Sequence, residues 1–248
     1  MARIFITGSA DGLGHLAAVE LVKQGHQVVL HARSEQRAEA ALRKIPGAEA
    51  ALPADLANMA DVKRLAAEVN KLGTFDAIIH NAGVYLVEKA LILAVNTLAP
   101  YVLTCLIRPP RRLVYLSSGS HLGGDSSLKG LLQKPPSANY SDSKLHDLVL
   151  AKAVARKWPG VYANAVDPGW VPTKMGGAGA PDNLEQGFQT QVWLAASDDP
   201  KALVSGHYFY HQRDARYQLN ADDIDVQERY LAACEQITGI SFPIENNK

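Results

Sequence analysis

Short apolar runs alternate with amphipathic segments along most of this 248-residue chain, and this alternation restricts the possible folds more than any other feature. Several of the runs are almost continuously apolar, which is typical of strands in a parallel sheet that has helices on both faces. Repeated strand–helix units imply right-handed crossovers between parallel strands. The sequence therefore predicts an α/β fold, with a doubly wound parallel sheet in a three-layer α/β/α arrangement.

The predicted elements follow one another without an internal repeat, a low-complexity tract or a linker, so we expect a single domain over residues 1–248. The predicted strands are Arg3–Thr7, Gln27–His31, Glu49–Pro53, Phe75–His80, Leu113–Ser117, Val161–Val166 and His207–Tyr210. The predicted helices are Leu13–Gln24, Glu35–Lys44, Met59–Lys71, Glu88–Leu106, Ser137–Trp158, Leu184–Ala196 and Asp223–Thr238.

Charge and cysteine content argue against several classes of partner. Lys plus Arg number 25 and Asp plus Glu also number 25, so no excess of positive charge attracts nucleic acid or anionic lipid. Apolar stretches such as Ala90–Val95 are too short to cross a bilayer, and a strand pattern at Arg3–Thr7 leaves no room for a leader peptide. Two distant cysteines, Cys105 and Cys234, are typical of a reducing compartment. We therefore expect a soluble, cytoplasmic protein with neither a nucleic-acid nor a membrane partner.

A glycine-rich segment, Thr7–Gly14, joins the first predicted strand to the first predicted helix. So tight a turn needs residues without a bulky side chain, and the helix N-terminus offers free N–H groups to a phosphate. Glycines in a loop are usually only a turn, but their place after the first strand favours a Rossmann-type dinucleotide site. Asp11 brings a negative charge close to the expected phosphates. The predicted cofactor contacts in this segment are Gly8, Ala10, Asp11, Gly12, Leu13 and Gly14.

The end of the second strand indicates which dinucleotide binds. An NAD site usually has an acidic residue here that bonds the ribose 2′-hydroxyl, whereas this strand ends in His31-Ala32-Arg33. Arg33 can pair with a 2′-phosphate through two parallel hydrogen bonds. The alternative interpretation is a solvated surface arginine. Because the acid is missing and a base is present, we predict NADP(H), with NADPH preferred over NADH.

Polar residues also follow the third and fourth strands. Asp55 can accept a hydrogen bond from an adenine amino group, while Asn81 and Gly83 can fix the loop and admit the ribose. Each residue alone is consistent with ordinary turn chemistry. Their shared place at the carboxyl edge of the sheet, where ligands of such folds bind, adds them and their neighbours Leu56 and Ala82 to the predicted site.

Tyr140 and Lys144 lie about one helical turn apart at the start of a long helical pattern, so both side chains point to the same face. A free phenol has a pKa of about 10, and a cation a few ångströms away favours the phenolate. Proton donation to an alkoxide then becomes feasible. A Tyr-x-x-x-Lys pair also occurs by chance on exposed helix faces. Ser118, at the end of the fifth strand, can donate a hydrogen bond to a substrate oxygen at the same edge.

These ordered motifs, together with Asn81-Ala82-Gly83, Asn96 and Asp167-Pro168-Gly169, resemble the short-chain dehydrogenase/reductase family over nearly the whole chain. The C-terminal part of the chain, with Ser205–Phe209 and the predicted helix over Gln227–Gly239, is most similar to the retinol-dehydrogenase-like branch of this family. The resemblance implies a catalytic tetrad of Asn96, Ser118, Tyr140 and Lys144. In such enzymes the tyrosine transfers the proton, the serine orients the carbonyl, the lysine holds the nicotinamide ribose and the asparagine orders a water relay.

The resemblance also implies a loop behind the nicotinamide and a mode of assembly. The residues expected to contact the cofactor from this loop are Pro168, Gly169, Val171 and Thr173. A homodimer or homotetramer is expected, formed through the helices Glu88–Leu106 and Ser137–Trp158, because each carries apolar residues beyond one core-facing stripe.

The predicted function is NADP(H)-dependent hydride transfer between the nicotinamide and a hydrophobic ketone, aldehyde or secondary alcohol, with Tyr140 as the acid/base. Leu122, Trp170 and Met175 suggest apolar pocket walls. The histidines show no metal-ligand spacing, so no metal is expected. One alternative is a noncatalytic NADP(H)-binding sensor, favoured only by the short Asn81–Asn96 segment. A sugar-nucleotide epimerase, the other alternative, usually has a larger C-terminal domain.

Overall fold

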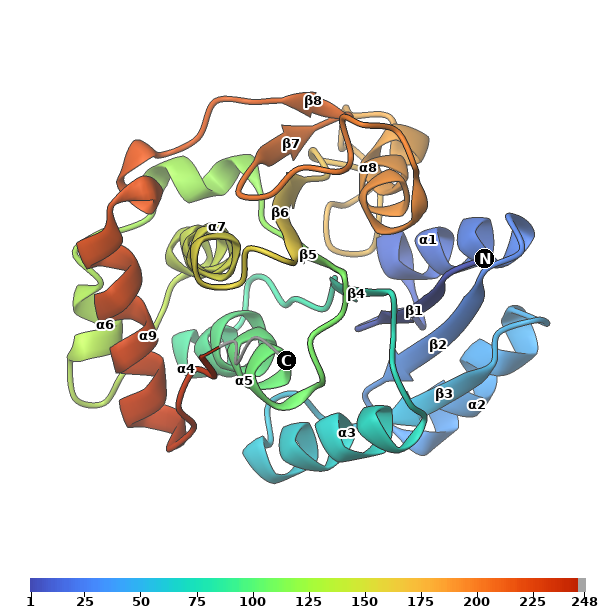
Figure 1. Cartoon of the computed structure of the whole chain (residues 1–248), viewed down its shortest axis with the longest axis horizontal. Helices are drawn as coiled ribbons and strands as arrows, with labels where there is room; N and C mark the ends of the chain where they lie inside the picture. The colour runs from blue at the N-terminus through green and yellow to red at the C-terminus, as the bar shows by residue number, and fades with distance from the viewer. Residues whose placement is uncertain (245–248) are drawn as a thin grey trace.

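An eight-stranded sheet forms the centre of the computed structural model, which describes residues 1–244 (Figure 1). The strands lie in the order β3-β2-β1-β4-β5-β6-β7-β8, and all neighbouring pairs are parallel except β7 and β8. Their bounds are β1 Arg3–Ile6, β2 Gln27–Ala32, β3 Ala50–Pro53, β4 Ala77–His80, β5 Arg112–Leu116, β6 Tyr162–Asp167, β7 Tyr208–Tyr210 and β8 Arg213–Asp214. The order reverses at β1, whose neighbours are β2 and β4, and ligands of open α/β sheets bind at such a switch point.

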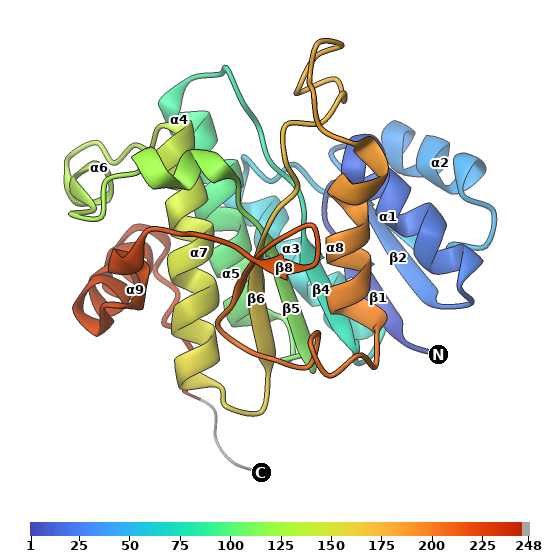
Figure 2. The ribbon, with the colours of Figure 1, turned by 90° about the horizontal axis from the view of Figure 1, so that it is seen from above.

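Helices cover both faces of this sheet, which gives the predicted three layers (Figure 2). The α-helices are α1 Gly12–Lys23, α2 Glu35–Lys44, α3 Met59–Lys71, α4 Lys89–Ile92, α5 Ala99–Leu106, α6 Lys129–Leu132, α7 Tyr140–Lys157, α8 Leu184–Ala196 and α9 Ile224–Thr238. Three short segments have other helical geometry: the π-helix η1 Leu93–Leu98 and the 3₁₀ helices η2 Gly119–Gly123 and η3 Leu219–Asp222.

Alternation along β1 separates the two hydrophobic cores. Ile4 and Ile6 pack with α1, α2 and α8 on one face of the sheet, whereas Phe5 packs with α3, α5, α7 and α9 on the other. All three side chains are fully buried. The fold class predicted from apolar runs is therefore confirmed, and its single domain extends through the described residues. Residues 245–248 of the predicted domain lie outside them.

The predicted strands agree with β1–β7 to within two residues at each end, whereas the segment predicted as one helix, Glu88–Leu106, is divided. It runs as α4, then the π-helix η1, then α5. The stretch Lys89–Leu106 is long and apolar enough to cross a membrane, contrary to the expectation drawn from Ala90–Val95. Because 67% of it is buried inside the protein, it has the character of a core helix. The short strand β8 was also not predicted.

Candidate active site

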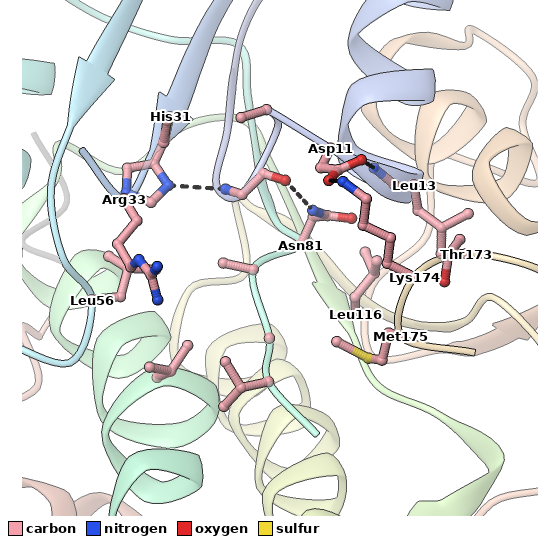
Figure 3. A pocket seen from close by; sticks show the side chains of 18 of the residues that line it. Asp11, Leu13, His31, Arg33, Leu56, Asn81, Leu116, Thr173, Lys174 and Met175 are labelled. Carbon is pink, nitrogen blue, oxygen red and sulfur yellow. Dashed lines mark hydrogen bonds and ion pairs between the residues drawn. The ribbon is translucent and has the colours of Figure 1, made fainter. Parts of the chain in front are cut away.

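A cavity of about 420 Å³ opens at the carboxyl ends of β1, β2, β4 and β5, at the predicted edge of the sheet (Figure 3). Most of the predicted site residues line it: Gly8, Ala10, Asp11, Gly12, Leu13, Arg33, Asp55, Leu56, Asn81, Ala82, Gly83, Tyr140, Lys144, Pro168 and Thr173. Five predicted residues do not: Gly14, Asn96, Ser118, Gly169 and Val171. The sequence patterns therefore locate the site, although these five residues lie behind the residues that line the cavity.

Close packing against β4 explains the glycine loop. Gly8 has a φ of +65°, and a Cβ placed on it would lie 2.9 Å from the Cα of Ala82. A Cβ on Gly14 would lie 2.3 Å from Nδ2 of Asn81. Gly14 is therefore required by the close packing of the loop on Asn81, although it does not line the cavity. The Asn81 amide donates to the carbonyl oxygens of Thr7 and Gly8 at 3.0 and 3.2 Å. Asn81 thus fixes the loop.

His31 is a residue of this site that the sequence interpretation missed (Figure 3). The N–H of Gly8 donates to Nδ1 of His31 at 2.9 Å, and Nε2 lies 3.0 Å from the carbonyl oxygen of Ala54. Since Nδ1 accepts, Nε2 carries the proton and donates to Ala54. Burial lowers the pKa of His31 to about 4, so the ring is neutral at physiological pH. His31 therefore ties the glycine loop to the end of β3, and only its place at the end of β2 hinted at this.

The cationic end of the cavity contains more than Arg33. Arg33 is exposed and Ala32 is buried beside it. Arg37 of α2 and Lys174 of the loop after β6 also line the cavity, and neither was predicted. Lys174 forms an ion pair with Asp11 (Figure 3). A guanidinium nitrogen of Arg37 lies 3.9 Å from the same carboxylate. The negative charge of Asp11 is therefore compensated.

Asp11 is also the N-cap of α1, since its Oδ1 accepts from the N–H of Gly12 at 3.0 Å. The hydrogen bond from Lys174 is the main reason that the pKa of Asp11 is lowered. Asp11 thus orders the start of the helix that points at the cavity, and it holds the loop after β6 against the glycine loop.

The predicted acid/base pair lies at the start of α7. A capping box between Asn139 and Asp142 begins this helix, so Tyr140 is its first residue and Lys144 follows one turn later. The ammonium nitrogen of Lys144 lies 5.7 Å from the centre of the Tyr140 ring. It donates to the carbonyl oxygen of Leu116 at 2.5 Å and to a carboxylate oxygen of Asp147 at 2.9 Å. Although burial lowers the pKa of Lys144, Asp147 and Tyr140 raise it by a greater amount, so the lysine is charged.

The two serines that follow β5 have different roles. Ser118 is half-buried at the start of η2, where its hydroxyl accepts from the N–H of Ser120 at 3.2 Å, outside the cavity lining. Ser117 does line the cavity, and its hydroxyl donates to the carbonyl oxygen of Lys144 at 2.7 Å. Ser117 therefore joins β5 to α7 and was not predicted, because the adjacent serine was assigned the chemistry.

Asn96 lies within the π-helix η1 and is buried. Its side chain accepts from the N–H of Val84 at 2.8 Å and donates to the carbonyl of Val84 and the hydroxyl of Ser143 at 3.0 and 3.1 Å. A Cβ on Gly83 would lie 3.6 Å from Oδ1 of Asn96 and 3.7 Å from the nitrogen of Lys144. Asn96 thus holds the loop after β4 next to the acid/base pair.

The loop after β6 closes one side of the cavity. Pro168 and Thr173 line it, with Met175 beyond them. Gly169 has a φ of +80° and packs on Asp182, while Val171 is buried against Gly187. Gly169 and Val171, which were predicted to contact the cofactor, therefore set the shape of the loop without lining the cavity.

Apolar residues around the acid/base pair differ from those predicted. Leu122 and Trp170 are exposed and do not line the cavity, whereas Met175 does. The other apolar side chains that line this cavity include Val84, Leu91, Val95 and Leu116. The ring of Tyr85 meets the Tyr140 ring edge-on, with 4.7 Å between their centres. Within residues 1–244, no group of three or more His, Cys, Asp or Glu side chains could hold a metal ion.

The sheet and the glycine loop are typical of a Rossmann-type dinucleotide-binding fold, and comparisons with known proteins identify the family. Residues 2–183 match the family model described as short chain dehydrogenase. An uncharacterized oxidoreductase of Emericella nidulans is 44% identical over 98% of this chain and 99% of its own length. Human dehydrogenase/reductase SDR family member 13 is 31% identical over 95% of this chain and 72% of its own.

The chain belongs to the short-chain dehydrogenase/reductase family, as the motifs predicted. The match to the human protein agrees with the predicted retinol-dehydrogenase-like branch of the family. A crystal structure of an uncharacterized protein from Mycobacterium paratuberculosis superposes with a TM-score of 0.80 and 26% identity, covering 98% of this chain and 95% of that one. The protein is therefore an oxidoreductase that acts on a small molecule with a nicotinamide cofactor.

Proposed function

We propose that this protein is an NADP(H)-dependent oxidoreductase that transfers a hydride between the nicotinamide and a hydrophobic ketone, aldehyde or secondary alcohol. The observation that carries the proposal is that a single cavity is lined by the glycine loop, Arg33, Tyr140 and Lys144. The glycine loop leaves room for a pyrophosphate at the N-terminus of α1. The cations Arg33 and Arg37 support binding of a 2′-phosphate, and the buried Ala32 brings no acid that would oppose it.

The acid/base chemistry follows from the groups at the start of α7. NADPH, when bound, would supply a hydride to the carbonyl carbon of the substrate. The phenol of Tyr140 donates its proton to the carbonyl oxygen as negative charge develops there, and solvent then returns a proton to the phenolate. Lys144 stabilises that phenolate, because its ammonium group lies over the Tyr140 ring. The hydroxyl of Ser118 accepts from the N–H of Ser120, so it can still donate its own proton to the same oxygen. Alcohol oxidation uses these steps in reverse.

The apolar lining supports a hydrophobic substrate. Val84, Leu91, Val95 and Met175 line the cavity together with Tyr140, and they offer dispersion contacts but no hydrogen-bonding groups on their side chains. A substrate with an apolar body and one carbonyl or hydroxyl group fits this combination.

A panel of carbonyl compounds, followed by loss of NADPH absorbance with NADH in parallel, tests the proposal. We expect reduction of hydrophobic ketones or aldehydes with NADPH and much slower reaction with NADH. The Tyr140→Phe variant is the control for enzyme-dependent turnover. Binding of NADPH without reaction of any compound in a diverse panel would contradict the proposal and favour the noncatalytic sensor.

We also propose a homodimer or homotetramer in the cytoplasm. Family membership supports self-association. The apolar residues of α7 contribute less than expected, because α9 packs against α7 within the same chain. Free Cys105 and Cys234 support a reducing compartment. Sedimentation at micromolar concentration and cell fractionation test these two points, and a monomer or a secreted protein would contradict them.

A further inference from the structure

An ion pair lies buried behind the acid/base residues. Lys144 and Asp147 are three residues apart on α7, with 2.9 Å between the ammonium nitrogen and a carboxylate oxygen. Their side chains are only 6% and 5% exposed. A carboxylate this far from water has a high desolvation cost, which only a well-placed partner offsets. Asp147 is three residues past the lysine of the Tyr-x-x-x-Lys pair, and the sequence interpretation gave it no role.

Four other titratable side chains around Asp147 are uncharged. Burial raises the pKa values of Tyr115 on β5 and Tyr230 on α9 above their usual range, so both remain phenols. Burial lowers the pKa of His80, stacked on Tyr115, to about 3 and that of His146 on α7 to about 4, so both rings are neutral. Within residues 1–244, Lys144 is thus the cation that balances Asp147.

We propose that Asp147 is a positioning residue: it holds the ammonium group of Lys144 against the carbonyl of Leu116 and, by its charge, limits how strongly Lys144 favours the phenolate of Tyr140. The proposal rests on the acid/base role given to Tyr140 above. Two partners fix the lysine nitrogen, and one of them carries a full negative charge. A negative charge this close to Lys144 opposes its effect on the phenol.

The charge of Asp147 is present at neutral pH. Burial raises the pKa of Asp147 to about 6, against the lowering effect of Lys144, so the carboxylate is ionised above that pH. Replacing it by asparagine keeps the shape and the hydrogen-bond acceptor but removes the charge. Lys144 then acts on Tyr140 without opposition.

The test is Asp147→Asn, followed by tyrosinate absorbance as pH is raised in the protein without cofactor. The signal of Tyr140 is isolated by subtracting the same titration in Tyr140→Phe, alone and combined with Asp147→Asn. We expect the midpoint to move to lower pH by about one unit, since a nearby charge shifts a titration by one to three units and this one acts through Lys144. The pH–rate profile should move in the same direction. Because absorbance needs no turnover, the result separates this proposal from the proposed reaction.

The matched control is Asp222→Asn, which also removes a carboxylate paired with a lysine of α7, Lys152, at 2.6 Å. Tyr217 donates to Asp222, so the Tyr140 signal is again isolated by subtracting the titration of the Tyr140→Phe, Asp222→Asn double variant. Lys152 lies two helical turns beyond Lys144, so this change should leave the Tyr140 midpoint in place. An unchanged midpoint in Asp147→Asn, or an equal shift in both variants, would overturn the proposal.

A second variant covers the case in which Asp147→Asn fails to fold. Lys144→Met leaves Asp147 as a neutral acid in an apolar site, which the fold tolerates better than an unpaired charge. Carboxyl carbon-13 NMR should show Asp147 titrating at a pH of about 6 in the wild type and at clearly higher pH in Lys144→Met. If the midpoint of Asp147 is the same in both proteins, Lys144 and Asp147 are not coupled and the proposal is wrong.

Discussion

At the scale of single residues, Arg33 is expected to decide between the two nicotinamide cofactors. It lines the cavity at the end of β2, beside the small Ala32. A hydrogen bond to a charged group contributes about 1.5–3 kcal/mol, so Arg33→Ala should weaken NADPH binding by roughly one to two orders of magnitude. NADH has no phosphate for Arg33 to hold and should bind as before.

Titration of both cofactors at fixed ionic strength measures this effect. Ala32→Asp is the reciprocal variant, because its carboxylate opposes the phosphate and accepts from a free 2′-hydroxyl. Equal weakening of both cofactors by Arg33→Ala, or a wild type that prefers NADH, would contradict the assignment.

Tyr140 is predicted to serve chemistry without holding the cofactor. Tyr140→Phe removes the hydroxyl and keeps the ring that packs edge-on against Tyr85. General acid/base catalysis is typically worth 10²–10⁴ in rate, so turnover should fall by at least about a hundredfold. NADPH affinity, measured by fluorescence titration, should change little. Activity within about tenfold of the wild type would remove Tyr140 from this role.

At the scale of elements, His31 joins β2, the glycine loop and the end of β3 through two hydrogen bonds. The pKa of His31 is about 4 in the folded protein, below the ordinary 6.5, so the unfolded chain takes up a proton first as pH falls. His31 therefore contributes stability that is complete above about pH 6.5 and is lost progressively down to about pH 4.

His31→Gln should remove this contribution, which amounts to about 3 kcal/mol at most. The measurement is the difference in free energy of unfolding between about pH 7 and about pH 4.5, from denaturant titrations. We also expect weaker NADPH binding, because the N–H of Gly8 loses its acceptor. An acid-induced loss of stability equal to that of the wild type would rule out this account of His31.

Sequence patterns predict helices and strands well where a run of residues is continuously buried. They predict them less well where contacts with residues distant in sequence set the local geometry. β1 to β7 were found because each is an apolar run between helices. The division of Lys89–Leu106 into three helical segments was not predicted. It depends on hydrogen bonds of Asn96 in η1 to Val84, 12 residues away in sequence, and to Ser143, 47 residues away. Motifs located the cavity, yet His31 and Lys174 were missed because their partners lie far away in sequence.

At the scale of the whole molecule, α9 packs on α7 and completes the core on that side of the sheet (Figure 1). Tyr230 of α9 is fully buried, and its ring meets those of Tyr101 and His146. Tyr230→Ala should therefore lower the free energy of unfolding by about 3–5 kcal/mol, as removal of large buried rings does. Tyr230→Phe, which keeps the ring, is the control in the same denaturant titration. A loss below about 1 kcal/mol in Tyr230→Ala would show that α9 is only loosely attached.

The contact of Asp11 with Lys174 and Arg37 has a consequence for how an anionic ligand enters. The protein's own carboxylate already occupies cations that a pyrophosphate or 2′-phosphate would seek, so binding exchanges one set of ion pairs for another. Asp11 therefore competes with the ligand for these cations. Added salt screens the ion pairs of Asp11 as well as those of the bound ligand.

We therefore expect a shallower salt dependence of NADPH affinity than the number of nearby cations suggests. Asp11→Asn retains an N-cap for α1 but frees both cations, so it should tighten NADPH binding several-fold and steepen that dependence. Titration of NADPH at several salt concentrations measures both effects. Weaker binding by Asp11→Asn would mean that the carboxylate keeps the loop after β6 in place for the ligand and does not compete with it.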